Sequence, residues 1–393
     1  MESNVRNVAV VGVGQTAFGK FLDRSLKGLG AEAIAGALDD AGARAADVQA
    51  VFAANAIAGL ITGQEMVRGQ VVLTATGIEG VPVVNVENAC AGGATALHLS
   101  WMAVASGQVD VALAFGAEKM AHEDKRKPVL AIATAMDVEE PIDVDSPSPF
   151  MSHYASRIRR YMSDTGATAT DFAMVATKAQ RNGALNDLAQ YGDASITPED
   201  ILRARSVADP LTVPMCSPIG DGAAAVLLVA QDALNRFPDA QPLYIRASVL
   251  VSGSDPDGGG AGAIERAARA AYDQAGVGPE DLDLVELHDA NAASEVMRYE
   301  SLGLAAAGDG PKLVRTGTTA RDGELPVNPS GGLIARGHPV GATGCAQIYE
   351  LATQLRGRAG ARQVATPRVA LAENGGGWVR GDVAADAVHI LTT

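Results

Sequence analysis

The chain has 393 residues, of which 47% are hydrophobic and 20% charged, so it holds enough apolar material for a large core divided between two domains or two similar halves. Its formal net charge of −15 argues against nucleic acid as the main partner, because phosphate backbones are bound by basic surfaces. Three widely spaced cysteines without a C-x-x-C pair argue against a disulfide framework or a zinc site and favour a reducing compartment.

The N-terminal sequence MESNVRNVAVVGVG lacks the basic start, long apolar stretch and cleavage site of a signal peptide. No apolar run approaches the roughly 18 residues that a membrane span requires, and the C-terminal HILTT is not a peroxisomal address. We therefore expect a cytoplasmic protein without a membrane span. The early segment GVGQTAFG is a weak match to a dinucleotide-binding loop, because its glycine spacing differs, and a turn after the first strand explains it equally well.

An internal duplication is the most informative pattern along the chain. Residues 37–52 and 271–286 match without a gap at an offset of 234 residues, and each predicts a helix that ends at a glycine, a turn with an aspartate, and a strand. A further match pairs residues 111–114 with 369–372, both VALA. The buried strands alternate with helical patterns, which favours an α/β fold made of two duplicated halves.

The duplication divides the chain into an N-terminal half, residues 1–238, and a C-terminal half, residues 239–393. The repeating pattern breaks between about 120 and 212, where a segment rich in Pro, Asp and Ser precedes helical patterns at 151–161 and 171–185. We interpret this region as an excursion from the first half that covers the mouth of an active site. The alternative is a solvated surface insertion without a role.

Cys90 is the candidate nucleophile. It follows a β-rich run and precedes a helical pattern, so it lies on a strand-to-helix turn whose N–H groups and positive helix end favour a thiolate. Gly92 and Gly93 leave room for a substrate beside the sulfur. The alternative is a buried structural cysteine, which is the role that we expect for Cys216 and Cys345.

Two histidines are candidates for acid–base work. An offset of 248 residues matches 90–97 with 338–345 and places His338 where Cys90 stands in the other half, so that His338 could accept the cysteine proton. Its alternative role is that of a loop histidine that binds a backbone group. His288 directly follows a predicted strand, where it could donate to a developing oxyanion or position a water molecule.

Five further residues are weaker candidates. Asn291 could assist the oxyanion or cap the helix that follows it, and Gly376, in the glycine run of ENGGGW, could support the same site. His122 and His153 lie in or beside the excursion, and Arg157 begins the basic run RIRR, so these three are candidates for substrate binding. No two histidines have the i, i+4 spacing typical of metal ligands, and we expect no metal site.

Taken together, these segments resemble the thiolase superfamily. ENACAGGATAL resembles its nucleophile segment, CSPIGDGAAAVLL the turn that closes its first half, and NPSGGLIARGHPVGATGCAQIYEL its Gly-His-Pro segment. ELHDANAASEVMRYESLGL resembles the His-Asp segment of the sterol-carrier-protein branch, which is acetyl-CoA acetyltransferase-like. The resemblance extends from Val8 to about Val383.

This resemblance implies a layered α-β-α-β-α fold in which an acyl-CoA acylates Cys90, His338 activates the thiol, and His288, with a water, stabilises the thioester oxyanion. It implies cleavage of a 3-oxoacyl-CoA by coenzyme A, or the reverse Claisen condensation, in fatty acid or aromatic degradation. Coenzyme A would be a substrate, without a tightly bound cofactor. A homodimer or tetramer is implied, and relatives in this branch often work with a small OB-fold subunit that bears a zinc ribbon.

The sequence departs from the family at its second catalytic cysteine. Many thiolases carry it in a C-x-G turn, which here reads ENGGGW from Glu373, and the sterol-carrier branch carries it in H-D-C-F, where this chain has Ala290. Either His288 or His338 then takes that role, or the reaction is a condensation or acyl transfer other than simple thiolysis. A non-catalytic lipid-binding subunit is a third possibility.

Overall fold

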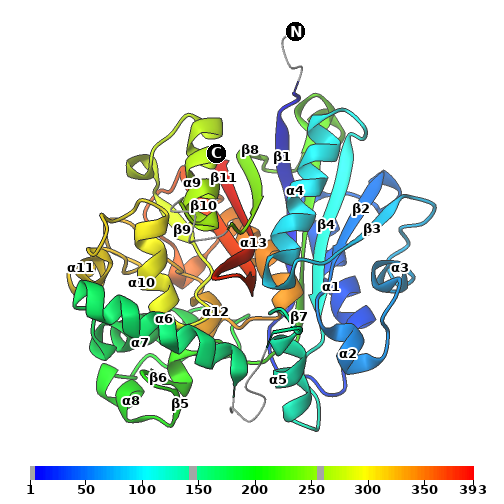
Figure 1. The fold of residues 1–393 in the computed structure, drawn as a ribbon. Helices are drawn as coiled ribbons and strands as arrows, with labels where there is room; N and C mark the ends of the chain where they lie inside the picture. Colours follow the sequence, from blue (N-terminus) through cyan, green and yellow to red (C-terminus); the bar gives the residue numbers. More distant parts are fainter. Residues whose placement is uncertain (1–4, 141–147, 255–260) are drawn as a thin grey trace.

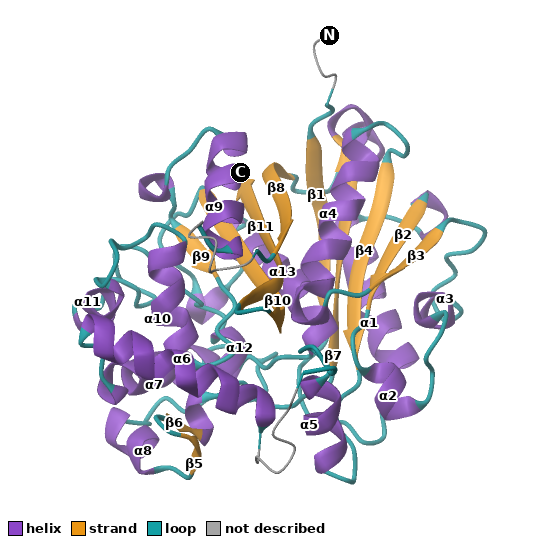
Figure 2. Ribbon diagram, viewed as in Figure 1, coloured by secondary structure: helices purple, strands orange, loops and turns teal. Residues whose placement is uncertain are grey.

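The computed structural model describes residues 5–140, 148–254 and 261–393. Its main feature is a nine-stranded sheet in the order β3-β2-β4-β7-β1-β8-β11-β10-β9 (Figures 1 and 2). These strands are β1 (Val8–Gln15), β2 (Ala50–Ala54), β3 (Val83–Val86), β4 (Val111–Glu118), β7 (Gly222–Ala230), β8 (Leu243–Ser252), β9 (Leu284–Glu286), β10 (Val369–Val379) and β11 (Asp382–Thr392).

The helices and short 3₁₀ turns that surround this sheet follow in chain order. They are α1 (Leu26–Ala41), η1 (Ala45–Asp47), α2 (Ala58–Thr62), α3 (Arg68–Leu73), η2 (Ala89–Ala91), α4 (Gly92–Ala105), α5 (Arg126–Ala133), α6 (Pro149–Thr165), α7 (Ala169–Gly183), α8 (Pro198–Arg203), α9 (Ala263–Ala275), η6 (Pro279–Asp281), α10 (Ala292–Ser301), α11 (Gly310–Arg315), α12 (Gly332–Ala335), η7 (Val340–Ala342) and α13 (Thr343–Leu355).

The sheet consists of two half-sheets with the same strand pattern. In the first, β1 runs antiparallel to β7, β7 runs antiparallel to β4, and β4 runs parallel to β2. In the second, β8, β11, β10 and β9 repeat these three relationships in the same order. Antiparallel pairing of β1 with β8 joins the halves. The duplicated α/β fold predicted from the sequence is thereby confirmed.

The local sequence explains the repeated helix–turn–strand units. Helix α1 ends at Gly42 and α9 ends at Gly276, whose φ values of 62° and 69° are in the left-handed region that glycine adopts without a steric penalty. The turns η1 and η6 follow, and each ends with an aspartate that accepts a hydrogen bond from the residue before the turn. Strands β2 and β9 then enter the sheet, as the duplicated sequence predicts.

Helices α4 and α13 form a middle layer between the two half-sheets, with α1 and α9 on the outer faces (Figure 1). The middle helices approach closely because glycines face each other. A Cβ on Gly93 would lie 2.9 Å from the carbonyl oxygen of Gly341, and one on Gly344 would lie 2.1 Å from the nitrogen of Ala94. The predicted α-β-α-β-α layering is confirmed, and its centre tolerates little added volume.

The middle helices also correct the predicted register of the duplication. Helix α4 begins at Gly92 and α13 begins at Thr343, which are 251 residues apart, whereas the sequence match used 248. Gly341 therefore occupies the place that Cys90 has in the first half, and the prediction that His338 is its counterpart is wrong by three residues. Both segments are so rich in Gly and Ala that several registers match almost equally well.

The excursion forms a helical region below the sheet in Figure 2, built from α5, α6, α7 and α8 with the small hairpin β5 (Ser206–Ala208) and β6 (Leu211–Thr212). The helical patterns at 151–161 and 171–185 correspond to α6 and α7, although each observed helix starts two residues earlier. Part of the predicted Pro, Asp and Ser-rich segment, residues 141–147, lies outside the described residues.

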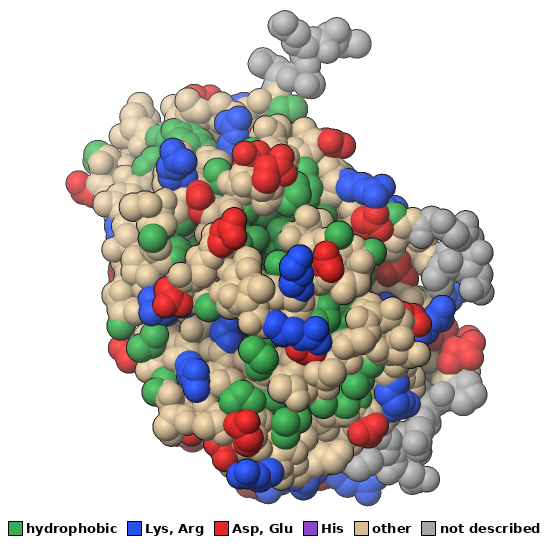
Figure 3. Space-filling view, turned by 90° about the vertical axis from the view of Figure 1, so that its left-hand side faces the viewer, with side chains coloured by type: hydrophobic (Ala, Val, Ile, Leu, Met, Phe, Trp, Pro, Cys, Tyr) green, Lys and Arg blue, Asp and Glu red, His purple; other side chains and the backbone are tan. Residues whose placement is uncertain are grey.

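One face of the molecule shows how its charges are distributed. In the view of Figure 3, Lys and Arg side chains are interspersed with Asp and Glu side chains. Such mixing differs from the broad basic surface that a polyanion requires. Within the described part of the chain, no helix is both long enough and apolar enough to cross a membrane.

Candidate active site

Cys90, His288 and His338 converge from three chain segments. One donor atom from each, the sulfur and two ring nitrogens, all lie within 4.8 Å of one another, and the two imidazole rings are 5.1 Å apart in an edge-to-face arrangement. All three side chains are buried. The fold thus brings together the three residues that the sequence marked as catalytic candidates. Among the described residues, they also form a group close enough to hold a metal ion.

The turn that carries Cys90 has an unusual backbone. Ala89 has φ = 46°, a left-handed conformation that is uncommon for a residue with a side chain. The carboxylate of Glu87 accepts a hydrogen bond from the N–H of Ala89 at 2.5 Å and holds the turn. On the other side Gly376 packs so closely that a Cβ there would lie 2.2 Å from the carbonyl oxygen of Asn88. Gly376 therefore shapes the cysteine turn.

Burial keeps the Cys90 thiol protonated in the resting protein. Burial, together with the nearby carboxyl of Glu118, raises the pKa of Cys90 to about 12, although the N–H groups of Gly377 and of Cys90 itself act to lower it. The sequence predicted a turn that favours the thiolate, and these N–H groups do so, but burial outweighs them. Gly377, rather than the predicted Gly376, presents its N–H to the sulfur.

The ring of His338 is held as a proton acceptor. Its Nδ1 lies 2.7 Å from Oγ1 of Thr343, and that hydroxyl donates to the carbonyl oxygen of Pro339 at 3.1 Å. Because the hydroxyl has one proton, the hydroxyl oxygen accepts from Nδ1–H, which leaves the lone pair on Nε2. Burial, with the adjacent Arg336, lowers the pKa of His338 to about 3, so the resting ring is neutral.

The ring of His288 is held as a donor. Nη2 of Arg298 lies 3.3 Å from its Nδ1, and a guanidinium can only donate, so the neutral ring carries its proton on Nε2. That atom is buried without a hydrogen-bond partner among the described residues. Burial, Arg298 and His338 hold the pKa of His288 well below its usual value. A substrate oxygen is the kind of group that would satisfy this donor.

Asn291 caps helix α10, one of the two roles that its sequence position allowed, and its assistance to an oxyanion stays a prediction. Its Oδ1 accepts the N–H of Ser294 at 2.9 Å and caps helix α10. Its Nδ2 is buried without a partner among the described residues and remains available as a donor. A buried amide that is half used is costly unless a ligand completes it.

Glu118, at the end of β4, is a residue near the site that the sequence reasoning missed. Its carboxylate accepts N–H groups from Ala56, Ile57, Ala58 and Gly341, and the side chain of Asn55. Burial outweighs these bonds and raises the pKa of Glu118 to about 7. This carboxyl joins the start of α2 to the turn η7, and only the folded structure brings those segments together.

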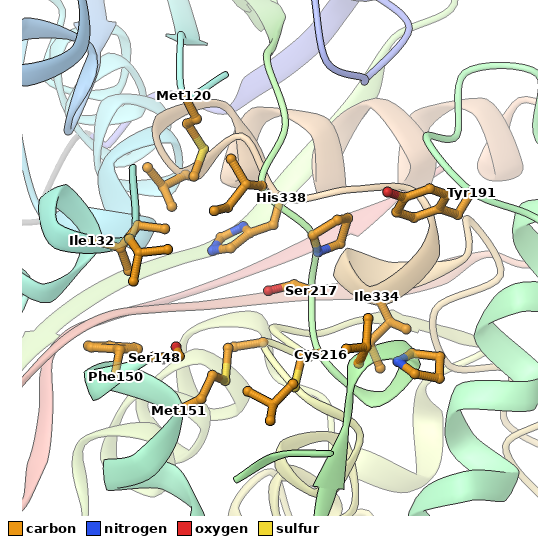
Figure 4. A pocket seen from close by; sticks show the side chains of 18 of the residues that line it. Met120, Ile132, Ser148, Phe150, Met151, Tyr191, Cys216, Ser217, Ile334 and His338 are labelled. Carbon is orange, nitrogen blue, oxygen red and sulfur yellow. The ribbon is translucent and has the colours of Figure 1, made fainter. Parts of the chain in front are cut away.

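A cavity of about 640 Å³ leads to Cys90 and His338. Figure 4 shows the His338 ring directed into a space surrounded largely by apolar side chains, among them Met120, Ile132, Phe150 and Met151. All four come from the predicted excursion, which therefore forms much of the cavity wall. Exposed Lys20 and Arg205 are also among the lining residues.

The three predicted substrate-binding residues lie away from the walls of this cavity. His122 accepts the N–H of Asp124 in the turn after β4. His153 and Arg157 project from α6 toward Trp378, the ring of His153 at 5.0 Å and the guanidinium carbon of Arg157 at 4.0 Å from its ring centre. Helix α6 instead presents Phe150 and Met151 to the cavity, and contact between substrate and the three residues stays a prediction.

The other two cysteines occupy different environments. Cys345 is fully buried in the core, and its sulfur lies 3.5 Å from the carbonyl oxygen of Gly93. Cys216, which the sequence reasoning assigned a structural role, lines the cavity, although burial raises its pKa to about 12. Any thiol-directed experiment on Cys90 must therefore account for Cys216.

Comparisons with known proteins show two family matches that together span most of the chain. The family described as "Thiolase, N-terminal domain" matches residues 8–232, and "Thiolase C-terminal domain-like" matches residues 253–393. The chain is 42% identical over 393 residues to an acetyl-CoA acetyltransferase of Methanothermobacter thermautotrophicus, covering 99% of this chain and 100% of that protein. It is 37% identical to the benzoylsuccinyl-CoA thiolase subunit BbsB of Thauera aromatica, covering 95% and 96%.

Two further comparisons concern a longer protein and a solved structure. Sterol carrier protein 2 of Bos taurus is 34% identical over 392 residues, which cover 95% of this chain and 71% of that protein. The Ltp2-ChsH2(DUF35) aldolase is similar in fold, with a TM-score of 0.79 at 23% identity over 98% of each chain. The structural likeness supports the fold alone.

Proposed function

The chain belongs to the thiolase family of acyltransferases, and on that premise we propose that it forms an acyl-enzyme on Cys90. The reaction is the cleavage of a 3-oxoacyl-CoA by coenzyme A, or the reverse Claisen condensation. One observation carries the proposal, namely the convergence of Cys90, His288 and His338, of which Cys90 and His338 line a 640 Å³ cavity. The three groups include a nucleophile, a proton acceptor and a hydrogen-bond donor.

In the proposed first step, the sulfur of Cys90 attacks the 3-oxo carbonyl while its proton passes to Nε2 of His338. Because Cys90 and His338 are both neutral at rest, no buried ion pair has to form between them before substrate arrives. The C2–C3 bond then breaks and leaves an acyl group on Cys90 and an enolate of acetyl-CoA. Nε2–H of His288, with Nδ2 of Asn291, would donate to the enolate oxygen, and the proton on His338 would quench its carbon.

In the second step, coenzyme A attacks the acyl-enzyme. His338 takes the proton of the coenzyme A thiol, the new thioester forms, and the Cys90 thiolate leaves and recovers that proton. We propose that the carbonyl oxygen of the acyl-enzyme accepts from the N–H groups of Cys90 and Gly377, which already point at the sulfur. Gly376 packs against the cysteine turn and thereby holds the N–H groups of Cys90 and Gly377 in position.

The cavity suits a coenzyme A thioester. Its apolar wall would hold the acyl chain and the pantetheine arm, while Lys20 and Arg205 lie at its exposed side, where the phosphates of coenzyme A would bind. Among the described residues that line the cavity, Asp193 is the one with an acidic side chain. Coenzyme A is thus proposed as a dissociable substrate, without a tightly bound cofactor.

A second candidate function is acyl transfer or condensation without simple thiolysis. The two positions where relatives carry a second cysteine have other roles here. Ala290 contributes a methyl group to the cavity wall, and Glu373 is buried in an ion pair with Arg298. His338 would then serve as base in one half-reaction and as acid in the other.

We also propose partners. Val84 is exposed on the edge strand β3. Met66 and Val67, just before helix α3, which packs against β3, are exposed as well. These three residues would form an apolar surface for a homodimer. Two similar proteins bear names that indicate assemblies, a thiolase subunit and an aldolase complex with a DUF35 chain. A small partner subunit is therefore proposed as well. The free thiols of all three cysteines support a reducing compartment such as the cytoplasm.

Intact-protein mass spectrometry tests the proposed function. The protein, in a Cys216→Ala background, is mixed with acetoacetyl-CoA and longer 3-oxoacyl-CoAs, with and without excess coenzyme A. A mass gain that maps to Cys90, disappears with coenzyme A and is absent in Cys90→Ser supports thiolysis. An adduct that persists in coenzyme A supports the condensing or acyl-transfer function. No adduct with any substrate contradicts the acyl-enzyme and favours a lipid-binding role.

A further inference from the structure

Next to the catalytic histidines lies a buried charged pair that the proposed chemistry does not use directly. The side chains of Arg298 on α10 and Glu373 on β10 are almost fully buried. Nε of Arg298 donates to both carboxylate oxygens of Glu373, at 3.0 and 2.9 Å. Burying two charges is costly, so such a pair contributes little to stability compared with an apolar alternative.

The pair holds His288 from two sides. Oε2 of Glu373 accepts the backbone N–H of His288 at 2.9 Å, and Nη2 of Arg298 approaches the ring nitrogen Nδ1 at 3.3 Å. The carboxylate of Glu373 thus holds the main chain of His288, and it also holds the guanidinium of Arg298, which contacts the His288 ring. Because Glu373 acts on both the backbone and the ring of His288, small shifts of its carboxylate would move the ring relative to Cys90.

Other ionisable groups near His288 do not disturb this arrangement. Burial and Glu373 hold the pKa of Asp386 on β11 well above its usual value, which favours the uncharged carboxyl. The neighbouring His338 is neutral and Cys90 is a thiol. Among the described residues, Glu373 is the carboxylate that accepts hydrogen bonds from Arg298, and the guanidinium can only donate toward Nδ1.

Resting on the function proposed above, we propose that Arg298, oriented by Glu373, is a positioning residue that fixes His288 with its proton on Nε2. A donor-only guanidinium at Nδ1 excludes the other neutral tautomer. His288 then cannot accept the proton of Cys90 and can only donate to substrate oxygen. The two histidines are thereby given separate roles, with His338 as the base.

The same contact opposes metal binding. A histidine that coordinates a metal through Nε2 has its proton on Nδ1 and donates it to an acceptor. At His288 that proton would face Nη2 of Arg298, another donor. Although Cys90, His288 and His338 are close enough for a zinc ion, the pair keeps one of the three from offering a lone pair.

Nitrogen NMR of the ¹⁵N-histidine-labelled protein tests the tautomer without any substrate, with His288 assigned by comparison with His288→Asn. The wild type is expected to show an unprotonated Nδ1 and a protonated Nε2, and to stay neutral well below the ordinary histidine pKa of about 6.5. In Arg298→Met/Glu373→Gln, which removes both charges together, we expect mixed tautomers and a pKa that moves up toward that ordinary value. Arg298→Lys, which keeps a donor, should restore the wild-type tautomer.

One control variant and two further measurements separate positioning from general damage. Arg356→Met/Asp40→Asn removes another ion pair, 2.7 Å long and buried at its arginine, and should leave the His288 spectrum unchanged. The rate of Cys90 acylation should fall about tenfold to a hundredfold in the Arg298/Glu373 double variant, with little change in KM. Zn²⁺, added alone, should bind the double variant at least about tenfold more tightly than the wild type.

A proton on Nδ1 in the wild type would overturn the proposal even if no variant folds. So would a His288 tautomer and pKa that do not change in the double variant. Failure of the acyl-enzyme experiment, with the predicted tautomer observed, would instead count against the proposed function and leave the positioning of His288 intact.

Discussion

Thr343 Oγ1 lies 2.7 Å from Nδ1 of His338 and gives its own proton to the carbonyl oxygen of Pro339. This relay leaves Nε2 of His338 as a proton acceptor beside Cys90. A single hydrogen bond of this kind contributes about 1 kcal/mol. We expect Thr343→Val to lower kcat about tenfold with little change in KM, and Thr343→Ser to restore it. Steady-state kinetics would check this, and an unchanged kcat in the valine variant would exclude the relay.

The reactivity of Cys90 should depend steeply on pH. Burial raises the pKa of Cys90 to about 12, so below that value the thiolate fraction falls about tenfold for each unit of pH. Alkylation by iodoacetamide, followed by peptide mass mapping, should therefore accelerate continuously from pH 7 to 10. A small thiol with an ordinary pKa, which levels off in this range, is the control. A plateau near neutral pH would reveal a standing thiolate–imidazolium pair.

Gly376→Ala should damage the cysteine turn. The added Cβ would lie 2.2 Å from the carbonyl oxygen of Asn88 and 2.5 Å from the nitrogen of Ala91, both backbone atoms that cannot move aside. We expect a loss of at least about 2 kcal/mol in unfolding free energy and loss of acylation. Gly28→Ala, in the exposed first turn of α1, is the matched control and should be neutral or stabilising. Urea denaturation measures both.

Glu118→Gln should lower stability and change its pH dependence. The new amide would face the N–H groups of Ala56, Ala58 and Gly341, at a cost of about 2 kcal/mol. Burial raises the pKa of Glu118 to about 7, so its contribution is present below its unfolded pKa and is lost as pH rises through 7. Urea denaturation at pH 5 and 8 should show this slope in the wild type. An equal slope in the variant would contradict the assignment.

The fold was predictable because its signals are local. Gly42 and Gly276 each end a helix, and the gap-free match of 37–52 with 271–286 exposes the duplication. The register of the middle helices was not predictable to the residue, because runs of Gly and Ala contain few distinguishing side chains. Only their packing against each other, at Gly93 and Gly344, decides which residues correspond.

The reactive groups of the site could be predicted from the sequence, but the residues that hold them in place could not. Cys90, His288 and His338 stand in recognisable segments, whereas Glu118, Arg298 and Thr343 act through contacts that only the tertiary fold creates. The spacing of Thr343, five residues after His338, was the one local signal that could have been used. The orientation of His153 was not predictable either, because only the fold shows that α6 turns it toward Trp378.

The glycine contact between α4 and α13 has a consequence for how the chain could be divided. Each helix begins beside the reacting groups, and each comes from a different half. The backbones meet with no side chain between Gly93 and Gly341, so the spacing of the catalytic groups is set by the docking of one half on the other. Two separately produced halves would each lack an active centre, and activity would return only on reconstitution.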